Sequence, residues 1–303
     1  MDTTDAPLAA EPRAPAAAWR HRIEAAAAGL FFAAMRALPL GLASAAGGAL
    51  ARLIGPHLPI SGRARRNLAQ ALPELAAKER RRVIAAMWDN LGRVAAEYPH
   101  LARIDVFAAP GRVAVAGLGH LEAALAAGRQ VIMFGGHLGN WELAPLAARQ
   151  YGLAMTHFYR AANNPLVDRM IARCRGGGDF APKGAAGSRR AFAALRRGGH
   201  LAMLVDQKLN DGIAVPFFGR PAMTAPALAL LALHFDCVVL PVRVERRRGA
   251  RFRLTVHPPL PVPRSGDRAG DVAALMTQVN RTLEAWIRER PEQWFWLHRR
   301  WPD

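Results

Sequence analysis

The chain has 303 residues, of which 51% are hydrophobic, so it can bury a sizeable core and is not disordered throughout. Its 41 lysines and arginines outnumber 23 aspartates and glutamates, and the net charge of +18 favours an anionic partner: nucleic acid, acidic lipid headgroups or an acidic carrier protein. The two cysteines, Cys174 and Cys237, are too few for a disulfide scaffold or a cysteine-based metal site.

An apolar stretch near the start of the chain, residues 25–51, carries one charge, Arg36. About 20 helical residues suffice to cross a bilayer, but this stretch is rich in Ala and Gly, has Arg36 near its middle and would be kinked by Pro39. Arginines on both flanks suit contact with anionic headgroups. We therefore expect a membrane-embedded or interfacial anchor. A buried helix pair in a soluble domain and a cleaved signal peptide are the alternatives.

The rest of the chain is expected to form an α/β domain. Residues 63–103 have a helical pattern, and after Pro110 short apolar strands alternate with helices. The expected strands are 112–116, 131–134, 153–159, 201–205, 238–244 and 252–257, and the expected helices are 120–127, 141–148, 165–175, 191–197, 227–235 and 272–290. Such alternation predicts a mostly parallel central sheet flanked by helices.

Three segments follow from this pattern. Residues 1–22, rich in Ala and Pro, are expected to be a disordered lead-in, and residues 23–60 to form hydrophobic membrane-anchor helices. Residues 61–303 are expected to be the α/β domain. The absence of a repeat of 20–50 residues excludes solenoids and propellers.

The densest chemical signal is FGGHLGNWEL at residues 134–143, directly after an apolar strand. The glycines allow a tight turn and close approach of a ligand to the backbone, at the strand end where α/β proteins bind ligands. His137 before the next helix and Glu142 on its first turn can meet, and a carboxylate on one ring nitrogen supports the other as a general base. Alternatively, His137 caps the helix and Glu142 is a solvated charge.

Other chemistries have little support in the sequence. It contains no G-x-S-x-G nucleophile elbow, no Walker A loop, no G-x-G-x-x-G and no H-E-x-x-H. His137, Glu142 and His157 do not show metal-ligand spacing. We therefore expect neither a cofactor nor a metal.

Several ordered motifs resemble the late acyltransferases of lipid A biosynthesis, the lauroyl/myristoyl transferase family, within the lysophospholipid acyltransferase-like superfamily. The superfamily signature is His, four residues, then Asp or Glu, which His137 and Glu142 match. The resemblance covers roughly residues 60–301. Its further blocks are YRAANNPL at 159–166, LRRGG at 195–199 leading to Asp206 and Gln207, VPFFGRPA at 215–222 with Thr224, and PEQWFWLHRRW at 291–301. The F-P-E-G-T-R block of glycerophosphate acyltransferases is absent, which disfavours a phosphatidic-acid pathway enzyme.

The resemblance implies acyl transfer from an acyl carrier protein thioester to a hydroxyl of a lipid A precursor, at the inner (plasma) membrane with the active site facing the cytoplasm. His137 is the implied general base, oriented by Glu142. Charge on the carbonyl oxygen needs donors, for which the amides of Gly136 and Gly139 or the side chain of Arg160 are candidates. Arg160 could instead clamp a substrate phosphate. The expected substrate-binding residues are Asn140, Asp206, Gln207, Gly219, Arg220 and Thr224.

Asp206 follows an apolar strand and has two interpretations: it orders the site or binds sugar, or it caps a turn. The tryptophans of the C-terminal tail belong either to a membrane interface or to the core. An acidic carrier protein, an anionic glycolipid and inner-membrane lipid would all be attracted to a chain of charge +18.

Rival functions remain at this point. One is acyl transfer to another glycolipid or a phospholipid. A non-enzymatic alternative is a basic membrane- or nucleic-acid-binding protein. Nucleic-acid binding predicts a recognition helix or interleaved aromatic and basic residues, and neither is found outside the tail, so no nucleic-acid partner is expected.

Overall fold

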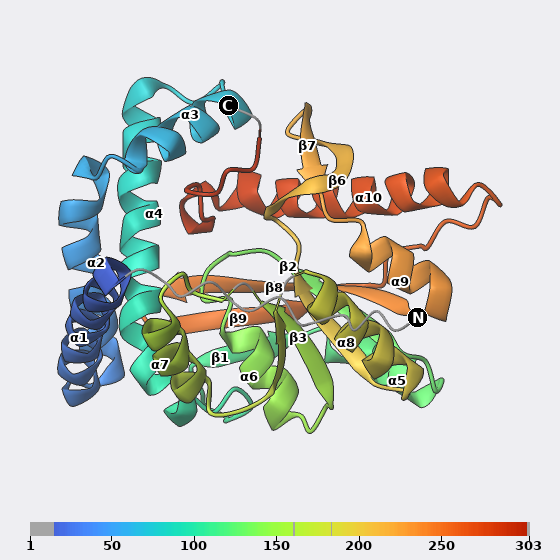
Figure 1. Ribbon diagram of the computed structural model, residues 1–303, viewed down its shortest axis with the longest axis horizontal. Coiled ribbons are helices and arrows are strands. Elements are labelled where there is room, and N and C mark those ends of the chain that lie inside the picture. Colours follow the sequence, from blue (N-terminus) through green and yellow to red (C-terminus); the bar gives the residue numbers. More distant parts are fainter. Residues whose placement is uncertain (1–14, 160, 183, 302–303) are drawn as a thin grey trace, which may run out of the picture.

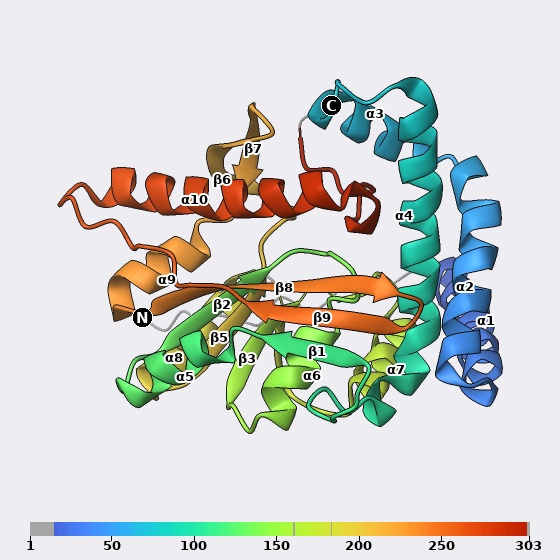
Figure 2. The same ribbon diagram turned by 180° about the vertical axis from the view of Figure 1, so that it is seen from behind.

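The computed structural model describes residues 15–301 apart from 160 and 183. Its centre is a seven-stranded sheet in the order β1-β9-β8-β2-β5-β3-β4, with a separate two-stranded hairpin, β6-β7 (Figures 1 and 2). All neighbours in the large sheet are parallel except β8 and β9, which form an antiparallel hairpin. The strands are β1 (Val113–Ala116), β2 (Val131–Gly135), β3 (Met155–Tyr159), β4 (Asp179–Pro182), β5 (His200–Leu204), β6 (Lys208–Phe217), β7 (Arg220–Thr224), β8 (Val238–Arg248) and β9 (Arg251–Val256).

Helices cover both faces of this sheet, so its strands are apolar on both sides. On β2, Val131 belongs to one core, which includes residues of α5 and α6, and Ile132 belongs to the other, which includes residues of α8, α9 and α10. This alternation follows from the two-residue repeat of a strand. The helices of the α/β domain are α5 (Leu118–Ala126), α6 (Leu143–Gln150), α7 (Pro165–Arg175), α8 (Ala185–Arg196), α9 (Ala227–Phe235) and α10 (Arg268–Glu289).

The N-terminal helices stand at one end of the sheet, where α1 and α2 lie beside the long α4 (Figures 1 and 2). They are α1 (Pro15–Ala37), α2 (Leu40–Ile54), α3 (Ser61–Ala71) and α4 (Ala77–Glu97), with short 3₁₀ turns η1 (Gly55–His57) and η2 (Tyr98–Arg103), and η3 (Pro291–Gln293) following α10. Pro39 separates α1 from α2, as its missing N–H and fixed φ predict.

The predicted fold class is confirmed: a mixed α/β fold with a mostly parallel sheet flanked by helices. The predicted membrane anchor has no such support, since no helix within residues 15–301, as far as they are described, is long and apolar enough to cross a bilayer. Part of the predicted lead-in, residues 15–22, lies in α1, and residues 1–14 lie outside the described chain. The sequence analysis also missed β4 and the β6-β7 hairpin.

The contact between α2 and α4 depends on glycine. A Cβ added at Gly47 would lie 2.5 Å from the Ala96 Cβ and 2.6 Å from the Gly92 carbonyl oxygen, distances that only a shift of one helix relieves. A Cβ at Gly41, on the same helix, would meet nothing within 4 Å.

We therefore predict that Gly47→Ala lowers the free energy of unfolding by about 1–3 kcal/mol through overpacking. Gly41→Ala, the matched control, should leave it unchanged or raise it by up to about 1 kcal/mol through helix propensity. Urea unfolding followed by circular dichroism measures both. Equal effects of the two substitutions would contradict the close approach of α2 to α4.

Candidate active site

Two neighbouring strands of the sheet bring a histidine and an aspartate together. β2 and β5 are parallel and pair Gly135 with Leu204. His137 follows Gly135 by two residues, and Asp206 follows Leu204 by two, so both leave the sheet at the same level of its carboxyl edge. Ligands of open α/β sheets bind at that edge.

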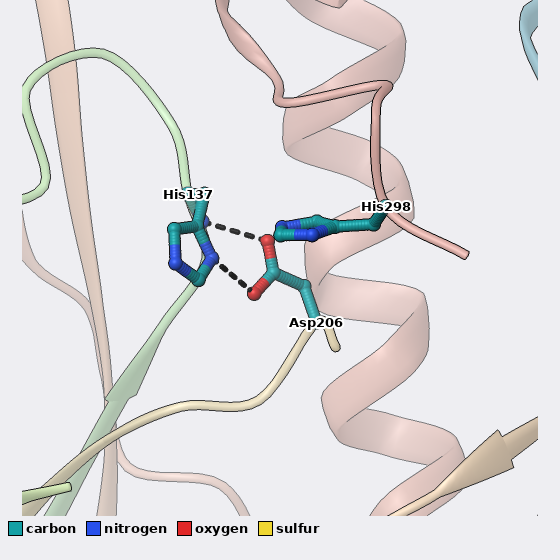
Figure 3. Close-up of side chains that lie close together, drawn as sticks. All are labelled: His137, Asp206 and His298. Carbon is teal, nitrogen blue, oxygen red and sulfur yellow. Dashed lines mark hydrogen bonds and ion pairs between the residues drawn. The ribbon is translucent and has the colours of Figure 1, made fainter. Parts of the chain in front are cut away.

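The Asp206 carboxylate is held by three N–H donors. Its Oδ1 lies 2.8 Å from the His137 Nδ1, and its Oδ2 accepts from the His137 amide at 2.7 Å and from the Trp294 Nε1 at 2.9 Å. The two contacts to His137 are drawn in Figure 3, where the carboxylate lies between the rings of His137 and His298. The backbone approaches the carboxylate closely here: a Cβ at Gly136 would lie 3.2 Å from the Asp206 Oδ2, a tight contact.

Asp206 is fully buried, yet it is ionised. Burial by itself would raise the pKa of its carboxyl, but the interactions with His137 and His298 outweigh burial and hold this pKa well below its usual range. A carboxylate bonded to Nδ1 holds the proton on that nitrogen and leaves Nε2 as the proton acceptor.

His137 lines a cleft of about 290 Å³, and its Nε2 is the ring nitrogen that Asp206 does not bind. The Gln207 Nε2 lies 3.5 Å from the His137 Nε2, a distance at the limit of a hydrogen bond. Gln207 also lines the cleft, and its role as a substrate-binding residue stays a prediction. The rings of His298 and Trp141 meet the His137 ring edge-on, with centroids 4.7 and 5.1 Å away. The imidazole is thereby fixed on several sides, while its Nε2 is not bound by Asp206.

Glu142 does not take the predicted position against His137. It is the N-cap residue of α6, and its two side-chain oxygens accept hydrogen bonds from Arg175 at the end of α7, from Nε at 2.7 Å and from NH2 at 2.8 Å. The Tyr98 hydroxyl donates to the same carboxylate at 2.8 Å. The orientation of His137 by Glu142 is therefore corrected: Asp206 holds the ring, and Glu142 pairs with the half-buried Arg175.

Glu142, Arg175 and Tyr98 form a second charged cluster, which lines the cleft. Burial, followed by the charge of Glu142, raises the pKa of Tyr98 well above its usual value, so the phenol keeps its proton and donates. Burial also lowers the pKa of the neighbouring His157 to about 4, which leaves that imidazole neutral. Glu142, Arg175 and Tyr98 therefore tie α6, α7 and η2 around the cleft.

Three of the predicted site residues instead form hydrogen bonds within the protein. Asn140 is fully buried; its Nδ2 donates to Glu97 at 2.7 Å and its Oδ1 accepts from the Glu142 amide. Thr224 is fully buried between the Ala222 carbonyl and the guanidinium of Arg300. The Gly139 amide donates to the Gln293 carbonyl, so it is not available to a substrate oxygen. Burial excludes the first two from substrate contact.

The remaining predicted residues divide as follows. Gly136 lines an apolar cavity beside the cleft, and its role as an amide donor stays a prediction. Gly219 and Arg220 lie at the tip of the β6-β7 hairpin, where Arg220 lines a different, basic pocket. Arg160 lies outside the described residues, and its two candidate roles stay predictions.

The apolar cavity has a volume of about 100 Å³ and shares Trp141, Tyr159 and Arg175 with the cleft. It runs between the sheet and α6, and its lining reaches from Met133 on β2 to Val115 on β1, at the edge of the sheet. An apolar space that shares its wall with the cleft lined by His137 suits a hydrocarbon chain.

His137, Asp206 and His298 could in principle hold a metal ion, because their ligand atoms lie within 4.8 Å of one another. However, both oxygens of Asp206 already accept N–H hydrogen bonds. A cation there would have to displace these bonds, so the donor set fits a histidine–carboxylate pair better than a metal centre.

Some functional residues escaped the sequence analysis. Arg175, Tyr98 and His298 lie far from the His137 motif in the chain and reach it only through the packing of α7, η2 and the C-terminal tail. For Asp206 a signal did exist: both it and His137 follow a buried apolar strand by two residues. What the sequence did not show is that these strands are neighbours.

A histidine held by a buried carboxylate at the carboxyl edge of a mostly parallel sheet, beside an apolar cavity, is the kind of site found in α/β enzymes that act on apolar substrates. The comparisons with known proteins name the family. Residues 18–303 match the model of the bacterial lipid A biosynthesis acyltransferases, and the chain belongs to that family. It is an acyltransferase, as the resemblance of its motifs implied.

Several relatives support this assignment. The chain is 27% identical to a lipid A biosynthesis acyltransferase of Haemophilus influenzae over 241 residues, which cover 78% of the chain and 73% of the relative. It is 27% identical to a lipid A biosynthesis lauroyltransferase of Escherichia coli over 245 residues, covering 78% and 76%. It is 28% identical to a phosphatidylinositol mannoside acyltransferase of Mycobacterium tuberculosis over 194 residues, covering 62% and 59%.

Proposed function

We propose that this acyltransferase moves a fatty acyl chain from an acyl carrier protein thioester to a hydroxyl of a lipid A precursor, with His137 as general base and Asp206 as the carboxylate that orients it. The observation that carries this proposal is the 2.8 Å contact between the His137 Nδ1 and the Asp206 Oδ1, which leaves Nε2 unbound by Asp206 on a ring that lines the cleft. No cofactor is needed for this step.

The reaction is a direct transfer. The Nε2 of His137 takes the proton of the acceptor hydroxyl while the hydroxyl oxygen attacks the thioester carbonyl carbon. The tetrahedral intermediate then collapses: the C–S bond breaks, the carrier thiolate leaves and takes the proton from His137, and an ester remains on the acceptor. Asp206 stabilises the imidazolium that forms between these two steps.

The apolar cavity is the proposed seat of the acyl chain. At about 100 Å³ it holds the volume of roughly three water molecules, so its lining side chains must move apart for a long chain to enter. Its lining is mostly apolar and includes Trp141, which also lines the cleft. A thioester carbonyl at the mouth of the cavity would lie next to His137.

The N-terminal helices are the proposed contact with the membrane surface. Most of the exposed large apolar side chains of the described protein lie between residues 19 and 60, with Leu30 and Leu53 more than 70% exposed. Exposed apolar side chains gathered in one segment, with arginines nearby, suit a helix pair lying in the interface of an anionic bilayer. We place the protein at the inner membrane with its cleft on the cytoplasmic side, where a carrier protein thioester would be found.

A second acceptor class follows from the comparisons. One relative is named a phosphatidylinositol mannoside acyltransferase, so a phosphoglycolipid other than a lipid A precursor is the alternative acceptor. The same cleft and base would serve either acceptor, and a panel of both lipids decides between them.

The catalytic pair is tested by a transfer assay with carrier protein thioesters and a lipid A precursor, read by mass spectrometry of the lipid. We predict that His137→Ala abolishes the gain of one acyl chain. Asp206→Asn should lower kcat by about 10³-fold or more, because an amide no longer fixes the tautomer or stabilises the imidazolium.

The control is Asp236→Asn, the same chemical change at an exposed carboxylate at the end of α9. It should keep kcat at the wild-type level, and circular dichroism should show all variants folded. Undiminished turnover in folded Asp206→Asn would refute its orienting role, and turnover in His137→Ala would refute the general base.

Chain length is tested at the far end of the cavity. We predict that Val115→Phe shifts the preferred donor to a shorter acyl chain, because the larger ring fills the end of the cavity at β1. Ala114→Phe, one residue away on the opposite, exposed face of β1, is the matched control and should keep the wild-type preference. Competition between thioesters of different lengths measures both. An unchanged preference in Val115→Phe would place the acyl chain elsewhere.

Membrane contact is tested by sedimentation with vesicles that contain anionic lipid. We predict that Leu53→Glu weakens binding about tenfold, since it removes an apolar contact and adds a charge of the wrong sign. Leu230→Glu on α9, outside the proposed contact surface, should bind like the wild type. Equal binding by all three proteins would reject the N-terminal helices as the contact.

A further inference from the structure

A second pocket, lined by four arginines, lies apart from the catalytic cleft. Its volume is about 420 Å³. The arginines come from three different parts of the chain: Arg63 and Arg66 from α3, Arg220 from the β6-β7 hairpin and Arg299 from the C-terminal tail. We refer to it as the arginine pocket; Asn67, Gln70 and Trp301 complete its lining.

Among the residues that the structure describes, no acidic side chain lines the arginine pocket. None of its four arginines forms an ion pair with a carboxylate of the described residues, unlike Arg175 and Arg246 in the frame of the fold. Four guanidinium groups that converge without a counter-charge repel one another, so an anionic occupant would be favourable.

Two of these arginines are also fixed in place. The Arg63 NH1 donates to the Leu297 carbonyl at 3.3 Å, while its Nε is buried and has no hydrogen-bond partner among the described residues. The Arg220 guanidinium donates to the Gln70 Oε1 and lies over the Trp301 ring, 5.4 Å from its centroid. Preorganised guanidinium groups match the geometry of phosphate oxygens and lose little conformational entropy when they bind them.

The arginine pocket and the cleft both adjoin the C-terminal tail. Asn67 in its wall donates to the carbonyl oxygens of Trp296 at 2.9 Å and His298 at 2.8 Å. Of two consecutive residues, His298 lines the cleft and Arg299 lines the arginine pocket. A substrate that reacts at His137 can therefore extend past the tail and place an anionic group among the arginines.

We propose that the arginine pocket binds a phosphate group of the glycolipid acceptor and so positions the acceptor hydroxyl at His137. This inference rests on the proposed function. The acceptor is favoured over the donor as the source of the phosphate, because α3 follows the exposed apolar segment that contains Leu58 and Ile60. If that segment lies at the bilayer surface, the arginines that follow it lie at the level of lipid headgroups.

The test compares a phosphorylated lipid A precursor with the same lipid after removal of its phosphates. With the phosphorylated acceptor, Arg66→Gln/Arg299→Gln should raise the acceptor KM about tenfold or more and leave the donor KM and kcat near wild type. With the dephosphorylated acceptor, wild type and variant should have the same KM. The matched control is Arg81→Gln/Arg82→Gln, which removes two exposed charges of α4 outside the pocket and should behave as wild type.

Binding without turnover separates this inference from the proposed function. Both lipids are offered to the protein in neutral vesicles, and sedimentation is measured. A preference for the phosphorylated lipid that the pocket variant loses and the control keeps supports the inference even if no acyl transfer occurs. Normal transfer with an unchanged acceptor KM overturns it, as does a rise in the donor KM alone, which would assign the pocket to the carrier thioester. Equal loss in both double variants would show bulk charge attraction and also overturn it.

Discussion

The parallel pairing of β2 with β5 is the constraint on which the site depends. It sets Gly135 opposite Leu204, so the residues two positions further on, His137 and Asp206, leave the sheet side by side. The histidine backbone and side chain then both bind one carboxylate, and the indole of Trp294 from the C-terminal tail closes on the same group. Changing the register by one residue would separate the pair, since successive residues of a strand face opposite sides.

Buried charges elsewhere hold the loop that carries His137. Glu97 of α4 has no exposed surface and accepts hydrogen bonds from Ser44, Asn140 and Arg246, which joins α2, the His137 loop and β8. Removing one partner of such a cluster leaves a buried charge unpaired, which costs about 3–5 kcal/mol. Together with the Glu142–Arg175 pair, this cluster places Asn140 and Glu142, which the motif suggested as site residues, in hydrogen bonds that hold the loop.

The local sequence pattern predicted most of the fold, because apolar runs and turn residues are recognised from neighbouring positions in the chain. The strand after Gly128 and the helices 165–175 and 227–235 were predicted from this pattern alone. The hairpin of β6 and β7 was missed because its polar and glycine-containing start does not alternate, and its position depends on contacts with α10. For the site, the sequence predicted His137 as the base and both carboxylates as important, but it assigned the orienting role to the nearer one. Chain proximity favoured Glu142, whereas strand order, which only the sheet shows, favours Asp206.

The central claim is that the proton of the neutral His137 ring sits on Nδ1 and is held there by Asp206. Nitrogen-15 NMR of the histidine-labelled protein, with His137 assigned by its absence in His137→Gln, reads the tautomer directly. The structure predicts the Nδ1–H form in the wild type and in Glu142→Gln, and its loss in Asp206→Asn. A wild-type ring protonated on Nε2, or a tautomer that changes with Glu142 and not with Asp206, would contradict the account.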